Sequence, residues 1–142
     1  METDHADQQS LRLGVLSRAP AEAVKLFADA LIPELGAIEV LRNRTGLVML
    51  PMADTVSGAP FYVGEVLLAE AHVRLASGEG YAACLGRDLE QALALALIDA
   101  AAGTQHLPHI DAFVAQHAAQ QTEADTLLRR QIEATRVEME TF

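Results

Sequence analysis

The stretch from residue 61 to residue 76, FYVGEVLLAEAHVRLA, alternates between apolar and polar side chains and constrains the fold more than any other segment. Its polar positions, Glu70, His72 and Arg74, are even-numbered, and its apolar positions are odd-numbered. Those apolar positions are Leu67, Ala69, Ala71, Val73 and Leu75. Because successive side chains of a strand point to opposite faces, this period of two predicts an antiparallel strand with one covered face and one wet face.

Glu65 has the same parity as these apolar positions, which predicts a carboxylate on the covered face. A carboxylate buried there without a partner costs several kcal/mol. We therefore predict that Glu65 pairs with Arg42 or Arg87 and organises either the sheet or a surface between subunits. Gly64, immediately before it, is typical of a bulge or of a close backbone approach.

Three shorter segments complete the predicted sheet. Residues 37–42 (AIEVLR) and 47–52 (LVMLPM) read as two strands, with a turn at residues 43–46 (NRTG) between them. Residues 81–86 (YAACLG) form the last predicted strand. The fold class that follows is α+β, with an antiparallel sheet of about four strands and helices packed on one face.

Helical spacing of apolar residues predicts helices before and after the strands along the chain. The first covers residues 7–18, and the second runs from about Pro20 until Pro33 stops it. A third begins at Asp88, a good N-cap with Gln91 in a capping-box arrangement. Its apolar stripe ends near Gly103.

The final third, residues 111–142, reads as one long helix whose apolar residues are loosely spaced. Too little of the chain remains to cover it, so we expect this helix to dock on a partner. Residues 1–9 are polar and acidic, and we expect them to be disordered. Residues 1–142 are expected to form a single domain, since a chain of this length buries a sizeable core.

The charge balance excludes two classes of partner. Ten Lys and Arg residues against 20 Asp and Glu residues give a net charge of −10, and Lys25 is the one lysine. Binding to nucleic acid or to an anionic membrane needs clustered cations, so neither is expected. No secretory signal or membrane-spanning run is recognisable, which favours the cytoplasm. Cys84 has no cysteine partner and reads as a small buried hydrophobe.

Motifs for nucleotide hydrolysis, dinucleotide binding, serine hydrolysis and zinc peptidase chemistry are missing from the sequence. One arrangement has the spacing of metal ligands: His106, His109, Asp111 and His117. A solvated loop between helices explains it more simply. Glu70, His72 and Arg74 resemble an acid–base set, but a wet strand face is again the simpler interpretation.

Several short segments, in one order and spread over most of residues 38–140, carry a resemblance to a known family. They are TGLV (45–48), FYVGEV (61–66), AHVRL (71–75), GY (80–81), GRD (86–88), ALIDA (96–100) and ATRVE (134–138). Together these segments resemble the PhnG subunit family of bacterial carbon–phosphorus (C-P) lyase.

The resemblance implies a subunit of the phosphonate-degrading core complex, acting with partners of the PhnH, PhnI, PhnJ and PhnL types. The implied reaction joins an alkylphosphonate, such as methylphosphonate, to C1′ of the ribose of ATP. Adenine is released, and ribose 1-methylphosphonate 5-triphosphate is formed. ATP is then a co-substrate of the complex, and this chain binds no cofactor of its own and is inactive alone.

The arginines that match family positions are Arg42, Arg74, Arg87 and Arg136, and Asp88 lies beside Arg87. Guanidinium groups suit carboxylates and phosphates, but we prefer ion pairs inside the chain or at an interface to substrate contacts. Without its partners the chain is expected to self-associate into a homo-oligomer. The alternatives are a non-catalytic assembly protein, or a small metal-dependent enzyme built on the histidine arrangement.

Overall fold

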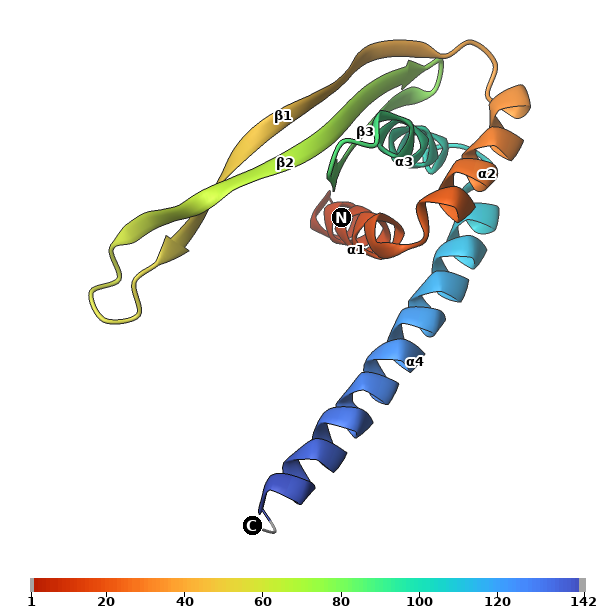
Figure 1. The fold of residues 1–142 in the computed structure, drawn as a ribbon. Coiled ribbons are helices and arrows are strands. Elements are labelled where there is room, and N and C mark those ends of the chain that lie inside the picture. The colour runs from red at the N-terminus through yellow and green to blue at the C-terminus, as the bar shows by residue number, and fades with distance from the viewer. Residues whose placement is uncertain (1, 141–142) are drawn as a thin grey trace.

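The structure is a computed structural model that describes residues 2–140, with the side chains of residues 3–136. Its sheet is antiparallel with the strand order β1-β2-β3. Figure 1 shows the elements: α1 (Glu2–Arg18), α2 (Ala21–Leu31), the 3-10 helix η1 (Ile32–Glu34), β1 (Glu39–Ala53), β2 (Pro60–Leu75), β3 (Gly78–Leu85), α3 (Leu89–Ala101) and α4 (Leu107–Glu140). The α+β class is confirmed, with three strands instead of about four.

The difference in strand number comes from the predicted turn at residues 43–46, which is wrong. These residues continue β1, and Asn43, Thr45 and Gly46 lie opposite Ala71, Ala69 and Leu68 of β2. Gly46 does not adopt a positive φ, so its turn-forming capacity is not used. The 16-residue β2 offers backbone partners along nearly all of β1, and this pairing overrides the local turn signal.

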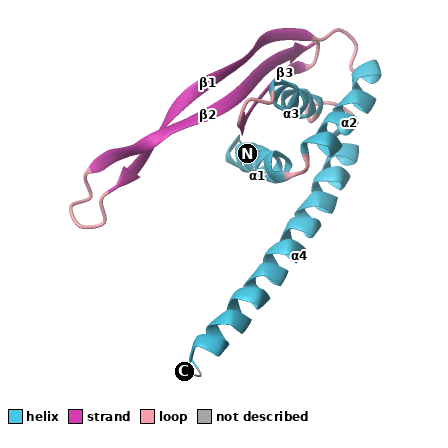
Figure 2. Cartoon of the chain, in the orientation of Figure 1, coloured by secondary structure: helices cyan, strands magenta, loops and turns pink. Residues whose placement is uncertain are grey.

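The half of the sheet formed by the end of β2 and by β3 is covered on one face. Figure 2 shows the helices gathered on that side. Ala69, Ala71 and Val73 are fully buried, as the alternating pattern predicted, and Cys84 of β3 is buried beside them. Burial raises the pKa of the Cys84 thiol, which keeps it protonated. The sequence-based prediction for this residue is therefore confirmed.

Gly80 of β3 allows α3 to approach the sheet closely. A side-chain Cβ at this position would lie 2.5 Å from the backbone nitrogen of Ala100 and 2.7 Å from its Cβ, and it would also overlap the carbonyl oxygen of Ala96. The facing surfaces are made of small residues, such as Ala82 on β3 and Ala96 on α3, which are both buried. Strand and helix therefore pack nearly backbone to backbone.

Asp99 of α3 ties α1 to β3. Its side chain is 9% exposed and accepts hydrogen bonds from the Gln9 amide at 3.0 and 3.1 Å and from the backbone N–H of Tyr81 at 3.0 Å. These donors satisfy a nearly buried carboxylate without a cation. The first helix begins at Glu2, earlier than the predicted 7–18, so residues 2–9 are helical where disorder was expected. Residue 1 lies outside the described residues.

Beyond β3 the first two strands continue alone. The pairing of β2 with β3 ends at Leu68 opposite Leu85. Residues 47–53 of β1 and 60–67 of β2 therefore form a two-stranded ribbon, which we call the arm, and which points away from the helices in Figure 1. In the loop at its tip, Asp54 accepts hydrogen bonds from the Val56 N–H at 2.9 Å and from the Ser57 hydroxyl at 2.7 Å. These bonds lower the pKa of Asp54.

The long C-terminal helix that the sequence predicted is present as α4, which begins at Leu107, slightly before the predicted residue 111. Its first part packs on the domain, with Ile110 and His117 buried. Residues 122–136 are exposed throughout, and they project from the body of the molecule. The expected docking of this segment on a partner stays a prediction, and residues 141–142 lie outside the described residues.

Candidate functional site

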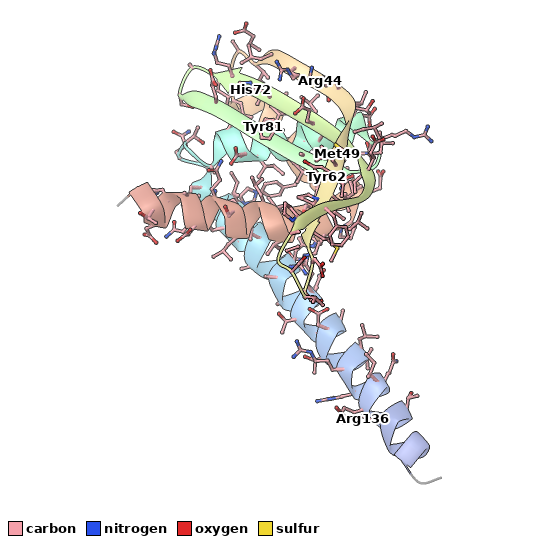
Figure 3. The ribbon with its side chains drawn as sticks, turned by 90° about the vertical axis from the view of Figure 1, so that its left-hand side faces the viewer. Arg44, Met49, Tyr62, His72, Tyr81 and Arg136 are labelled. Atoms are coloured by element: carbon pink, nitrogen blue, oxygen red, sulfur yellow. The ribbon has the colours of Figure 1, made fainter. Side chains whose placement is uncertain are left out.

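The uncovered face of the sheet carries a cluster of charged side chains, which we call the charged face. Glu70 of β2 lies at its centre, between arginines of β1 and a tyrosine of β3. The Arg44 Nε donates to Glu70 at 2.6 Å, the Tyr81 hydroxyl donates to it at 2.7 Å, and the Arg42 guanidinium lies 4.0 Å away. Three strands thus contribute to one ion-pair cluster, and Figure 3 shows Arg44, His72 and Tyr81 on the same sheet.

These contacts fix the protonation states of Glu70 and Tyr81. The Tyr81 hydrogen bond and the nearby Arg44 lower the pKa of Glu70. The same hydrogen bond, together with partial burial, raises the pKa of Tyr81. At neutral pH the carboxylate is therefore ionised and the phenol protonated, so Glu70 is a weak base and Tyr81 is a hydrogen-bond donor.

A second group on the charged face is centred on Glu79 of β3. The Arg74 guanidinium donates to Glu79 at 2.9 Å and approaches Glu39 of β1 at 3.4 Å. The ring of His72 lies 2.8 Å from the other carboxylate oxygen of Glu79. The hydrogen bonds from Arg74 and His72 lower the pKa of Glu79. This carboxylate too is held in its ionised form.

The charged face balances its own charge. Three arginines, at positions 42, 44 and 74, face three glutamates, at positions 39, 70 and 79. No surplus of positive charge is left there for phosphate groups. The residues considered as an acid–base set are thus engaged in ion pairs on a wet strand face, as the simpler interpretation held. Arg44, Tyr81 and Glu79 were missed, although their partners on β2 carried the alternating signal.

The predicted N-cap at the start of α3 is confirmed. Asp88 accepts a hydrogen bond from the backbone N–H of Gln91 at 3.0 Å, and Lys25 of α2 pairs with it at 2.9 Å. The Lys25 hydrogen bond lowers the pKa of Asp88. Arg87, the preceding residue, is exposed and makes no ion pair with the described residues.

The predicted pairing of Glu65 is wrong. Glu65 is exposed, lies opposite Met49 in the arm, and contacts neither Arg42 nor Arg87. The reason is that β2 extends beyond β3, so the parity that buries Ala69 leads at Glu65 to a face that no helix covers. Glu65 therefore has no role in organising the sheet.

Two of the residues considered as metal ligands are engaged with other parts of the chain. His106 lies 3.5 Å from the carboxylate of Glu34, which follows α2. Asp111 lies 3.7 Å from the guanidinium of Arg12 on α1. These contacts pull the two side chains toward different helices.

The other two residues pack on aromatic rings. His109 stacks on Phe27 with ring centroids 5.0 Å apart, and the buried His117 packs edge-on against Phe113 at 4.5 Å. Within the described part of the chain, no three or more histidine, cysteine or carboxylate side chains gather to hold a metal ion. The arrangement thus serves to pack α4 against the domain.

Arg136, the remaining family-matching arginine, lies on the exposed part of α4, far from the charged face (Figure 3). Together with Arg87, it shows that the matching arginines do not converge on one place. In residues 2–140 no helix is long and apolar enough to cross a membrane.

Comparison with known proteins assigns the family. Residues 8–142 match the family described as "Phosphonate metabolism protein PhnG". The chain is 32% identical over 137 residues to a protein of Rhizobium meliloti (strain 1021) named "Alpha-D-ribose 1-methylphosphonate 5-triphosphate synthase subunit PhnG". The match covers 95% of this chain and 86% of that relative. The chain therefore belongs to the PhnG family of phosphonate metabolism proteins.

Proposed function

We propose that this chain is a non-autonomous subunit of a synthase that transfers an alkylphosphonate to C1′ of the ribose of ATP, releasing adenine. The product with methylphosphonate is ribose 1-methylphosphonate 5-triphosphate. The observation that carries the proposal is the match to the Rhizobium meliloti synthase subunit along 95% of the chain. The other core subunits, of the PhnH, PhnI, PhnJ and PhnL types, are the proposed partners.

The electrostatics support a role that depends on partners. ATP and a phosphonate are both strongly anionic, whereas the chain carries a net charge of −10 and repels them at long range. The arginines of the charged face are already neutralised by glutamates. The cations that hold the triphosphate, and the groups that act on the ribose, are therefore supplied by other subunits. ATP enters as a co-substrate of the complex, and this chain contributes no cofactor.

Reconstitution tests the proposal. The purified chain, the other core subunits without it, and the complete set are each incubated with ATP and methylphosphonate, and adenine is measured by chromatography. We expect adenine from the complete set alone. Adenine released by the isolated chain, or by the other subunits without it, would contradict the proposal.

A second candidate is an assembly protein that takes no part in turnover, and the self-neutralised charged face favours it. Arg87 distinguishes the two, because it is exposed and makes no ion pair with the described residues. In a reconstituted complex that remains intact, Arg87→Ala lowers adenine release per complex if the chain reaches the substrate. Unchanged turnover in an intact complex identifies an assembly role.

A further inference from the structure

The arm is apolar on both of its faces. Leu47 and Met49 continue the covered face of the sheet, and they are 64% and 51% exposed. Val48 and Leu50 continue the charged face, and they are 48% and 47% exposed. Figure 3 shows Met49 and Tyr62 together on this part of the ribbon. The change is abrupt, because Arg44 and Glu70 occupy the same face as Val48 only a few residues away.

Such a ribbon does not have the pattern of a strand pair that stays in water. A sheet with one wet face shows polar residues on that face, as β2 does from Glu70 onward. Strands that are apolar on both faces are typical of sheets covered on both sides. The pattern of the arm therefore indicates that both of its faces are covered when the protein functions.

The charge of the arm limits what can cover it. From Thr45 to Val73 the sequence contains no lysine or arginine. Asp54 is satisfied by its own loop, but Glu65 is exposed on a strand of the arm, beside Met49. If the arm is enclosed, the Glu65 carboxylate must meet a cation or several N–H donors, because a charge buried without a partner is costly, and an arginine of the partner supplies both.

A second copy of this chain fits these requirements poorly. It carries the same net charge of −10, and its arm has no cation to offer. Adding a strand to the edge of β1 is also hindered. Pro51 lacks a backbone N–H, and the register shifts between Leu50 and Pro51.

We propose that the arm inserts into an apolar cleft of another subunit of the synthase, which covers both faces of the arm and places an arginine or lysine against Glu65. This inference rests on the proposed function, since that function supplies the partner. The partner is expected to have a cleft with apolar walls and a positively charged side chain within reach of Glu65.

Variants on each face of the arm test the enclosure. Met49→Ser changes one face, Leu50→Ser changes the other, and Leu26→Ser is the matched control on α2, where Leu26 is 69% exposed. Each variant is co-expressed with the other core subunits, and the subunit that co-purifies with the wild-type chain is identified. The affinity of each variant for that purified subunit is then measured. We expect each arm variant to bind at least about tenfold more weakly and Leu26→Ser to bind normally. Circular dichroism confirms that all variants are folded.

Charge variants test the cation. Glu65→Gln is expected to weaken binding, and Glu65→Arg to weaken it further, because the second variant places two like charges together. Equal binding by wild type and Glu65→Arg would contradict the proposed cation. Loss of binding by only one of the two face variants would contradict enclosure on both sides.

Two further outcomes separate this inference from the proposed function. If the wild-type chain does not associate with the other core subunits, the proposed function fails and the inference fails with it. If wild type and all arm variants associate equally well, the inference alone is wrong. A dimer of the isolated chain that the arm variants dissolve would identify a second copy as the occupant and overturn the inference.

Discussion

The two halves of the β1–β2 ribbon have the same backbone pairing and opposite surroundings. Antiparallel pairing runs from Glu39 opposite Arg74 to Ala53 opposite Pro60. In one half, β3 and α3 bury Val73 completely, whereas in the arm Val48 is 48% exposed. The pairing of β1 with β2 thus does not depend on helices packing over the strands. The covered half stabilises the fold, and the arm leaves its apolar surface exposed.

The largest effect on stability is expected at Gly80. The covered half requires a glycine at this position, and no position in the arm has such a requirement. Gly80→Ala places a Cβ against the backbone of α3, at 2.5 Å from the Ala100 nitrogen, and is expected to cost about 3 kcal/mol of unfolding free energy. In the arm, a Cβ added at Gly64 would meet no other atom within 4 Å, and Gly64 has no positive φ. Gly64→Ala is expected to change stability by less than about 0.5 kcal/mol.

Urea unfolding of the two variants measures this difference. The denaturant slope shows whether the covered half still unfolds as one unit. Equal stability of Gly80→Ala and Gly64→Ala would show that α3 can move away from the sheet, and would break the contrast between the halves.

Two valines on the same ribbon give the next largest difference. Val73→Ala removes buried methyl groups and leaves a cavity, at a cost of about 2 kcal/mol. Val48→Ala in the arm removes groups that are already partly in water, and is expected to cost less than about 0.5 kcal/mol. Thermal unfolding provides the measurement. A comparable loss in both variants would mean that the arm is covered in the isolated chain.

A substitution at Asp99 tests whether α1 contributes to the stability of the covered half. Asp99→Asn weakens the bonds from Gln9 and from the Tyr81 N–H, and is expected to cost about 1 kcal/mol. Asp54→Asn is the control in the arm loop, and a smaller change is expected there because Asp54 is more solvated. Hydrogen exchange of the Tyr81 amide reports the site directly. Unchanged exchange in Asp99→Asn would contradict the link.

The smallest effect is expected for the dependence of stability on pH in the acidic range. Because Tyr81 and Arg44 lower the pKa of Glu70 in the folded chain, ionised Glu70 stabilises the fold at neutral pH. This contribution is lost as the pH falls below about 4, toward the lowered pKa. Glu70→Gln is expected to flatten the loss of stability between neutral and acidic pH. Urea midpoints across this range provide the test, and equal curves for Glu70→Gln and wild type would contradict it.

The sequence predicted the structure correctly where the local residue pattern agrees with the packing of the folded chain. The alternation before Leu75 predicted the buried face, and Asp88 predicted the start of α3, because each signal is expressed within a few residues. The long C-terminal helix was predicted for the same reason. The family resemblance, carried by ordered segments across the chain, is confirmed by the match over residues 8–142.

The failures occurred where a distant element decides the outcome. Parity placed Glu65 on the covered face, but no local signal reports that β3 ends at Leu85 and leaves that face open. The turn residues around Gly46 were overridden by pairing with β2. Arg44 and Tyr81 were missed because their role appears only when three strands place them around Glu70.

The arm also has a consequence for how the cell handles this chain. Its strands are apolar, carry one charge at Glu65, and leave the edge of β1 unpaired along its length. Exposed apolar surface of this kind promotes non-specific association of chains, even where Pro51 hinders regular strand addition at the edge. If a partner subunit encloses the arm as proposed, a chain made in excess of that partner leaves this apolar surface exposed and prone to aggregation, and balanced synthesis of the chain and its partner keeps the surface covered.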